Sequence, residues 1–210
     1  MMLENIKRDF LSGKFAKADY IQKMHGVHQN IFEYASFIKD TDISSIMITD
    51  DNVIMCTRDR GIRLYVDPLD ERIVPIEILN FGNYEKQEIE IVAKLLTDVF
   101  TVMDIGANIG WYSLNLAMIK PELCIYSFEP IPRTYHQLQR NIALNNIHTI
   151  ITHNFGFSDR DDTIPFYYSP QGSGSASARN ISEKKSVEEI KCKVTTIDDF
   201  IRKHGGGWIL

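Results

Sequence analysis

The central part of the chain alternates apolar, strand-length segments with helical segments. Strands are predicted over VFTVMDI (99–105), LCIYSF (123–128) and TIITHNF (149–155), and helices over 108–119 and 132–146. Near-continuous apolar runs of this length are typical of parallel strands that helices cover on both faces. The alternation therefore predicts an α/β fold with a Rossmann-like, doubly wound parallel sheet and right-handed crossovers.

An N-terminal appendage of two parts is predicted before this sheet. Residues 1–45 carry apolar side chains at helical spacing and are expected to be helical. Residues 46–82 are expected to form a small antiparallel β-meander, because four short β-type runs alternate there with turn residues. These runs are SIMIT, NVIMC, IRLYV and VPIEIL. The domain with the parallel sheet would then extend over 83–210 and begin with a helix in YEKQEIEIVAKLL.

The C-terminal part predicts a strand pair, TIPFYYS (163–169) and EIKCKVTTI (189–197), around a Gly/Ser-rich segment (169–186) that we expect to be mobile. A helix follows over DDFIRKH (198–204), ends at glycines, and is followed by the start of a strand in WIL (208–210). Three parallel strands and the beginning of a fourth would leave an apolar sheet edge unpaired. We therefore expect the sheet domain to be incomplete at its C-terminus.

Composition restricts the class of function. The 210-residue chain has 23 Lys and Arg against 28 Asp and Glu, a formal net charge of −5, which argues against a protein that coats nucleic acid. No apolar run approaches the roughly 18 residues of a membrane span, and the charged opening is unlike a signal peptide, so a cytoplasmic protein is expected. The three cysteines form no C-x-x-C, and the pair His25 and His28 lacks a third ligand, so no metal is expected.

The segment VMDIGANIGWYS carries the most informative motif. Asp104 ends the first parallel strand, and Gly106 and Gly110 lie in the turn before the next helix. Glycines there let the backbone approach a ligand at the carboxyl end of the sheet. Glu129 stands nineteen residues beyond Gly110, at the end of the second strand, where a carboxylate can accept hydrogen bonds from vicinal ribose hydroxyls. Together these residues predict a nucleotide-type cofactor.

The glycine pattern and the charge of the loop distinguish between two such cofactors. A dinucleotide site requires G-x-G-x-x-G, whereas this loop has only two glycines, with Asn108 between them. The carboxylate of Asp104 would also repel a pyrophosphate. It suits a ligand with an ammonium group and no phosphate, which favours S-adenosylmethionine (SAM) over a nicotinamide dinucleotide.

The chain resembles the FkbM family of SAM-dependent methyltransferases in VMDIGANIGWYSLNLA, YSFEPIPRTYHQLQRNIALNN, FGFSDRDDTIPFY and VTTIDDFI, over roughly residues 75–210. The resemblance implies a sheet of the class I methyltransferase type. It also implies that Asp104, Gly106, Asn108 and Gly110 line the methionine end of SAM, that Glu129 holds its ribose, that Pro130 contacts the cofactor, and that Asn154, Gly156 and Ser158 border its adenine. Tyr84 and Glu85 match an acidic Y-E motif that either touches the cofactor or only caps a helix.

The resemblance further implies O-methylation of a hydroxyl on a sugar or another small natural product. The family's acidic I-D-x-E-G segment is absent, so neither the acceptor nor a general base is identified, and His153 is either a base or a structural residue. Two alternatives stay open. One is a non-catalytic SAM-binding remnant or interaction module, and the other is an NAD-dependent oxidoreductase. The oligomeric state is not predicted.

Overall fold

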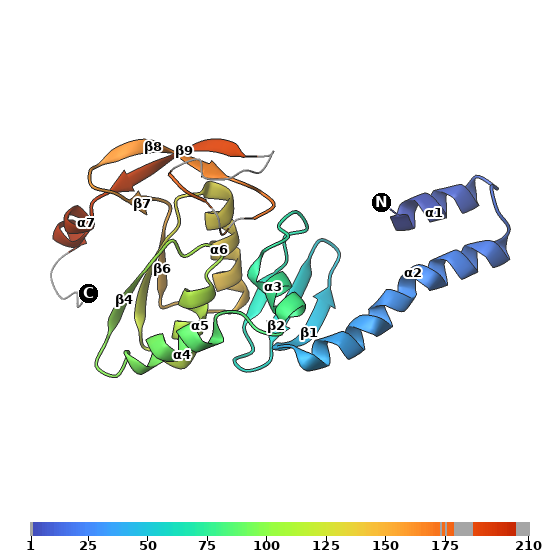
Figure 1. Ribbon diagram of the computed structural model, residues 1–210, viewed down its shortest axis with the longest axis horizontal. Coiled ribbons are helices and arrows are strands. Elements are labelled where there is room, and N and C mark those ends of the chain that lie inside the picture. Colours follow the sequence, from blue (N-terminus) through green and yellow to red (C-terminus); the bar gives the residue numbers. More distant parts are fainter. Residues whose placement is uncertain (1, 173, 175, 179–186, 205–210) are drawn as a thin grey trace. The chain divides into compact units, whose positions relative to one another are not determined.

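The computed structural model describes residues 2–172, 174, 176–178 and 187–204 (Figure 1). The chain forms two compact units, residues 1–41 and 42–210. The first unit contains helices α1 (Met2–Leu11) and α2 (Lys17–Phe37) and a 3-10 turn, η1 (Ile38–Asp40). The helices meet through a stacked pair of rings, Phe10 and Tyr20, whose centroids are 4.4 Å apart. Helix was expected over 1–45; the structure confirms it as far as Asp40, whereas residues 43–45 already belong to a β-strand.

The second unit begins with an antiparallel sheet of β1 (Ile43–Ile48), β2 (Val53–Thr57) and β3 (Arg63–Tyr65), in the order β1-β2-β3. The predicted meander is thus confirmed in these three strands. Its buried side chains include Ile54 and Leu64.

The fourth predicted strand of the meander is wrong: the segment containing VPIEIL is helix α3 (Val74–Phe81). Pro75 lies in its first turn, where proline stabilises a helix start, and Gly82 ends it at φ 88°. Most of the side chains of α3 are buried. In a short, almost uniformly apolar run, the spacing of apolar residues does not distinguish a strand from a helix. This explains the error.

A parallel sheet follows, with β4 (Thr101–Ile105), β5 (Cys124–Phe128) and β6 (Ile150–His153) in the order β4-β5-β6. Helices α4 (Lys86–Lys94), α5 (Trp111–Ile119) and α6 (Pro132–Leu144) alternate with these strands. The Rossmann-like parallel α/β arrangement that the sequence predicts is confirmed.

Strand β4 is less buried than its apolar sequence predicts. All five of its residues are partly or fully accessible, and Ile105 is 50% exposed. The reason is its position, since β5 is the one strand that pairs with β4 in the described part of the chain.

Helix α6 joins the meander to the parallel sheet through two asparagines. The buried side chain of Asn141 accepts a hydrogen bond from Tyr65 N (3.0 Å) and donates one to Ile109 O (2.9 Å). Asn145 accepts from Arg63 N (2.8 Å) and donates to Arg63 O (2.7 Å). Strand β3 and the start of α5 are therefore held against the same helix.

A third sheet has the order β7-β9-β8, with β7 (Gly156–Phe157), β8 (Asp162–Tyr168) and β9 (Glu188–Thr195). Strands β8 and β9 are antiparallel, as predicted. Figure 1 shows this pair at the end of the sheet where β6 leads into β7, followed by helix α7 (Ile197–His204), which is also predicted correctly. The tip of the Gly/Ser-rich segment, the glycines that should end α7, and the strand expected at 208–210 lie outside the described residues.

Aromatic rings connect α7 to the parallel sheet. The fully buried Phe128 lies 5.0 Å from the rings of both His153 and Phe200. Burial lowers the pKa of His153, with a further contribution from His204. These contacts favour the structural alternative for His153 over a catalytic base. Among the described residues, no helix has both the length and the apolar character needed to cross a membrane.

Candidate active site

The loop between β4 and α5 lies at the carboxyl end of the parallel sheet. Gly106 N and Ala107 N both donate to Phe128 O, at 2.9 and 3.0 Å, so the loop is fixed to the end of β5. Gly106 has φ +81°, a conformation that favours glycine, and a Cβ added there would meet no atom within 4 Å. The space above Gly106 is open, which suits close approach of a ligand to the backbone.

Gly110 has a different role from Gly106. Its φ is +95°, and a Cβ added there would lie 2.7 Å from Leu138 Cδ1 on α6. The missing side chain is therefore explained by the packing of α5 against α6. Sequence reasoning, which placed Gly110 only at the cofactor, did not predict this contact.

The carboxylate of Asp104 is turned toward α5. Its Oδ2 accepts from Ser113 N (3.1 Å) and Ser113 Oγ (2.5 Å), and Ser113 Oγ is 2.6 Å from Ser127 Oγ. Burial raises the pKa of Asp104, while the two hydrogen bonds from Ser113 act in the opposite direction. Sequence reasoning missed both serines. The signal was present, because Ser127 is a polar residue in an apolar strand and pairs with Asp104 in the β4/β5 register.

Glu129 connects the glycine loop to the start of α6. Its side chain is buried, Oε2 accepts from Asn108 N (3.0 Å), and Oε1 accepts from Ile131 N (2.8 Å). Burial raises the pKa of Glu129 to about 7, with the Asp104 charge contributing in the same direction, and the two backbone hydrogen bonds oppose this rise. Asp104, Asn108 and Glu129 are thus brought together around one loop, as the sequence predicts.

Two of the three residues expected at the adenine, Asn154 and Gly156, lie around the end of β5. Asn154 Nδ2 donates to Glu129 O (2.8 Å) and Pro130 O (3.2 Å), and a Cβ at Gly156 would lie 3.5 Å from the Pro130 ring. Ser158 is placed differently: its backbone N–H bonds Thr195 O (2.9 Å) and its hydroxyl bonds Asp159 (3.1 Å). Ser158 therefore belongs to the β7/β9 contact.

Tyr84 and Glu85 lie beside the start of α5. Glu85 precedes α4 in a left-handed conformation (φ 45°) and makes no side-chain capping hydrogen bond. Burial, reinforced by the Glu85 carboxylate, raises the pKa of Tyr84 and of Tyr112 to about 12. The ring of Tyr84 contacts that of Trp111 edge-on, with centroids 6.2 Å apart. Trp111 and Tyr112 were not predicted, although they directly follow Gly110.

Two buried polar atoms at this loop make no hydrogen bond in the structure, Asn108 Oδ1 and Trp111 Nε1. Buried groups of this kind are normally satisfied, so each is a candidate for a ligand contact. The donor and acceptor set fits SAM: carboxylate and amide oxygens suit an ammonium group, and a buried carboxylate at the end of β5 suits ribose hydroxyls. Two acids near the loop do not fit a pyrophosphate. Among the described residues, no group of three or more His, Cys, Asp or Glu could hold a metal ion.

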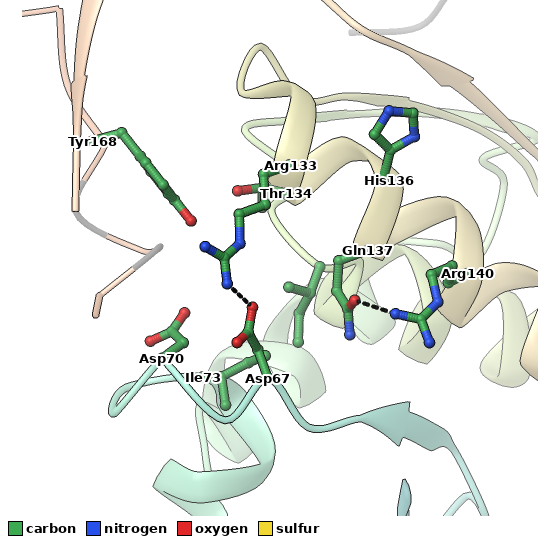
Figure 2. A pocket seen from close by; sticks show the side chains of 10 residues that line it. Asp67, Asp70, Ile73, Arg133, Thr134, His136, Gln137, Arg140 and Tyr168 are labelled. Atoms are coloured by element: carbon green, nitrogen blue, oxygen red, sulfur yellow. Dashed lines mark hydrogen bonds and ion pairs between the residues drawn. The ribbon is translucent and has the colours of Figure 1, made fainter. Parts of the chain in front are cut away.

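A cavity of about 440 Å³ lies between the segment that follows β3 and helix α6 (Figure 2). Ile109, from the glycine loop, and Thr134 are part of its wall. Figure 2 shows the ion pair between Arg133 and Asp67, 2.5 Å long, at its centre. Arg140 bonds the neutral amide of Gln137 (3.3 Å), and the two acids of the wall, Asp67 and Asp70, balance the formal charges of Arg133 and Arg140.

Comparison with known proteins identifies related sequences. The model of the TRM5/TYW2 methyltransferase domain matches residues 55–161. Methyltransferase 1 of Beauveria bassiana (strain ARSEF 2860) is 31% identical over 126 residues, which are 52% of this chain and 50% of that protein. Methyltransferase sdnD of Sordaria araneosa is 34% identical over 99 residues, 47% of this chain and 38% of that protein. The chain thus spans at most about half the length of these curated relatives.

Among solved structures, the methyltransferase FkbM from Methylobacillus flagellatus KT is 20% identical, with a TM-score of 0.33, and covers 50% of this chain and 23% of its own. The prediction of a SAM-dependent methyltransferase domain is confirmed by the family match and the two relatives. The family match spans just over half of the sequence and includes the glycine loop and Glu129. This chain belongs to the TRM5/TYW2 methyltransferase domain family.

Proposed function

We propose that the chain is the cofactor-binding part of an FkbM-type methyltransferase, acting in the cytoplasm on a hydroxyl group of a sugar or another small natural product. One observation carries the cofactor assignment. Glu129 accepts a hydrogen bond from Asn108 N, so the acid expected at the ribose and the loop expected at the methionine end form one continuous wall. The net charge of −5 supports a small-molecule acceptor over a nucleic acid.

The proposed site has three parts, one each for the methionine end, the ribose and the adenine of SAM. Asp104 and Asn108 would hold the methionine end, where Gly106 leaves room for the ligand. Glu129 would accept hydrogen bonds from the ribose hydroxyls, since its carboxylate is fixed by two backbone donors. Pro130 and Asn154 would form the border of the adenine.

When bound, SAM supplies an electrophilic methyl group on a sulfonium centre. Transfer of this methyl group to an acceptor hydroxyl would give a methyl ether, S-adenosylhomocysteine and a proton. The protein's contribution is to hold acceptor, methyl group and sulfur in line, which can supply several kcal/mol of the barrier reduction. The rigid loop fixed by Phe128 O serves this purpose.

The cavity next to α6 is our candidate for the acceptor (Figure 2). Its volume of about 440 Å³ suits a small molecule. Thr134 Oγ1 and the Tyr168 hydroxyl interact with each other in its wall and are groups to which a hydroxyl-bearing ligand could hydrogen-bond. Since the ion pair of Arg133 and Asp67 is already formed, a neutral ligand that offers hydroxyl groups fits this wall better than a charged one.

Titration calorimetry of the folded chain with SAM, S-adenosylhomocysteine and NAD tests the cofactor assignment. Micromolar affinity for the first two and none for NAD is expected. Binding of NAD instead would favour the oxidoreductase, and no binding of any of the three would favour the non-catalytic module.

The acceptor is tested by incubating the chain with SAM and a panel of neutral glycosides and polyols, and measuring S-adenosylhomocysteine. A Thr134→Val variant should bind SAM normally and lose turnover of any acceptor found. Turnover of carboxylated or phosphorylated acceptors only would contradict the assignment of a neutral, hydroxyl-bearing substrate.

A further inference from the structure

Two serines, Ser113 and Ser127, lie beside Asp104 and have no assigned role in cofactor binding. Ser113 lies on α5 and Ser127 on β5, and both are fully buried. Together with Asp104 they connect three elements of the fold at the base of the glycine loop. Hydrophobic residues fill most neighbouring positions, so two adjacent buried hydroxyls at this place require a reason.

The geometry of this cluster is directional. Both hydrogen bonds that Asp104 receives end on Oδ2, from Ser113 N and Ser113 Oγ. Since the Ser113 hydroxyl has one proton and gives it to the carboxylate, the 2.6 Å contact with Ser127 is completed by the Ser127 proton. Ser127 therefore fixes the rotor of Ser113, and Ser113 fixes the carboxylate of Asp104.

We infer that Ser113 and Ser127 are positioning residues that hold the Asp104 carboxylate by Oδ2 and so leave Oδ1 for the ammonium group at the methionine end of SAM. This inference rests on the proposed function, because it takes SAM as the ligand of the loop. A carboxylate in a buried site needs donors to remain ionised, and an unclamped one would rotate and lose its orientation. The serines meet both requirements without a countercharge.

The test compares two ligands that differ at the methionine end. SAM carries the amino-acid group, whereas 5′-methylthioadenosine has the same nucleoside and lacks it. In Ser113→Ala we expect SAM affinity to fall by roughly 10-fold or more, the effect of weakening a charge-assisted contact. The affinity for 5′-methylthioadenosine should stay within about twofold of the wild-type value, because the ribose and adenine contacts are untouched.

Matched variants separate positioning from general damage to the fold. Ser169 is also a buried serine, and its hydroxyl makes no hydrogen bond in the structure, so Ser169→Ala should leave the affinity for both ligands unchanged. Ser127→Ala should also weaken SAM binding selectively, but by less. It removes only the hydrogen bond that fixes the orientation of the Ser113 hydroxyl. Ser113→Thr keeps a hydroxyl and should restore part of the SAM affinity.

The pH profile of binding supplies a second readout. Without the Ser113 hydroxyl, Asp104 loses a contact that lowers its pKa, so the pKa of Asp104 should rise. As the pH is lowered, Asp104 should then become protonated, and SAM affinity should begin to fall, at a higher pH than in the wild type. Glu129 is the other titratable group whose charge couples to Asp104, and it faces the ribose side. Its titration should affect both ligands alike, whereas the shift caused by Ser113→Ala should affect SAM alone.

The outcomes are distinguishable. A folded wild-type chain that does not bind SAM overturns the proposed function and this inference with it. If the wild type binds SAM and Ser113→Ala weakens both ligands equally, or neither, the proposed function stands and the positioning role is wrong.

Discussion

The buried carboxylate of Glu129 accepts a hydrogen bond from the backbone N–H of Asn108, 3.0 Å away, across the gap between the end of β5 and the glycine loop. A second backbone donor, Ile131 N, binds the other carboxylate oxygen at 2.8 Å. The side chain is therefore fixed before any ligand arrives, and it couples the two parts of the site that the sequence identified separately.

Replacing Glu129 by alanine should weaken SAM binding. Loss of charge-assisted hydrogen bonds is expected to cost about 1.5–3 kcal/mol, or roughly 10- to 150-fold in affinity. Calorimetry measures the change, and Glu90→Ala, an exposed acid on α4, is the control. Unlike Ser113→Ala, Glu129→Ala should weaken SAM and 5′-methylthioadenosine alike. If the SAM affinity of Glu129→Ala is unchanged, the assignment of Glu129 to the ribose is wrong.

The raised pKa of Glu129 also predicts how stability depends on pH. An unfolded glutamate has a pKa of about 4.3, and burial raises the native value to about 7. Between these values the native state retains a proton that the unfolded state has lost, so the free energy of unfolding should fall as pH rises from 4.5 to 7. The total decrease is about 4 kcal/mol and should be complete above pH 8.

Urea unfolding at pH 5 and pH 8 measures most of this decrease, about 3 kcal/mol. Glu129→Gln cannot titrate, so its decrease should be smaller than that of the wild type by about 3 kcal/mol. Asp104 also has a raised pKa, and its charge couples to that of Glu129, so the difference between the two proteins includes this coupling. Equal pH dependence of the two proteins would show that Glu129 is not the group responsible.

Gly110→Ala should destabilise the fold through packing. The new Cβ would lie 2.7 Å from Leu138 Cδ1, and φ is +95°. We expect the free energy of unfolding to fall by about 2–4 kcal/mol. Gly61→Ala is the matched control, since φ is +66° there with nothing within 4 Å, and should cost only about 1–2 kcal/mol. Equal losses in urea unfolding would indicate that backbone strain alone is responsible.

Asn141→Ala should destabilise the fold by weakening the attachment of the meander to helix α6. The side chain bonds Tyr65 N and Ile109 O, and its removal leaves a donor and an acceptor unpaired inside the protein. The expected loss is about 2–4 kcal/mol of unfolding free energy. Asn80→Ala, an exposed asparagine, should change stability by less than about 0.5 kcal/mol. A loss for Asn141→Ala no larger than this would contradict the role of Asn141.

Elements with a clear local signal were predicted well. Strands β4, β5 and β6 are apolar runs bounded by turn residues, and α6 begins at Pro132 as expected. Helix α3 was not predicted, because its length and near-uniform apolar character fit either a strand or a buried helix. The burial of β4 was overestimated, because burial depends on neighbours that the strand's own sequence does not contain.

The sequence by itself determined the parallel strands, the glycine turn that contains Gly106 and the placement of Asp104 and Glu129 at strand ends, since each follows from residues within a few positions of one another. Tertiary structure decided which partners these residues have. The contact of Gly110 with Leu138, the bond from Asn108 to Glu129, and the pairing of Ser113 with Ser127 join residues 14 to 28 positions apart. Such contacts depend on how strands align and helices pack, and local periodicity carries no information about them.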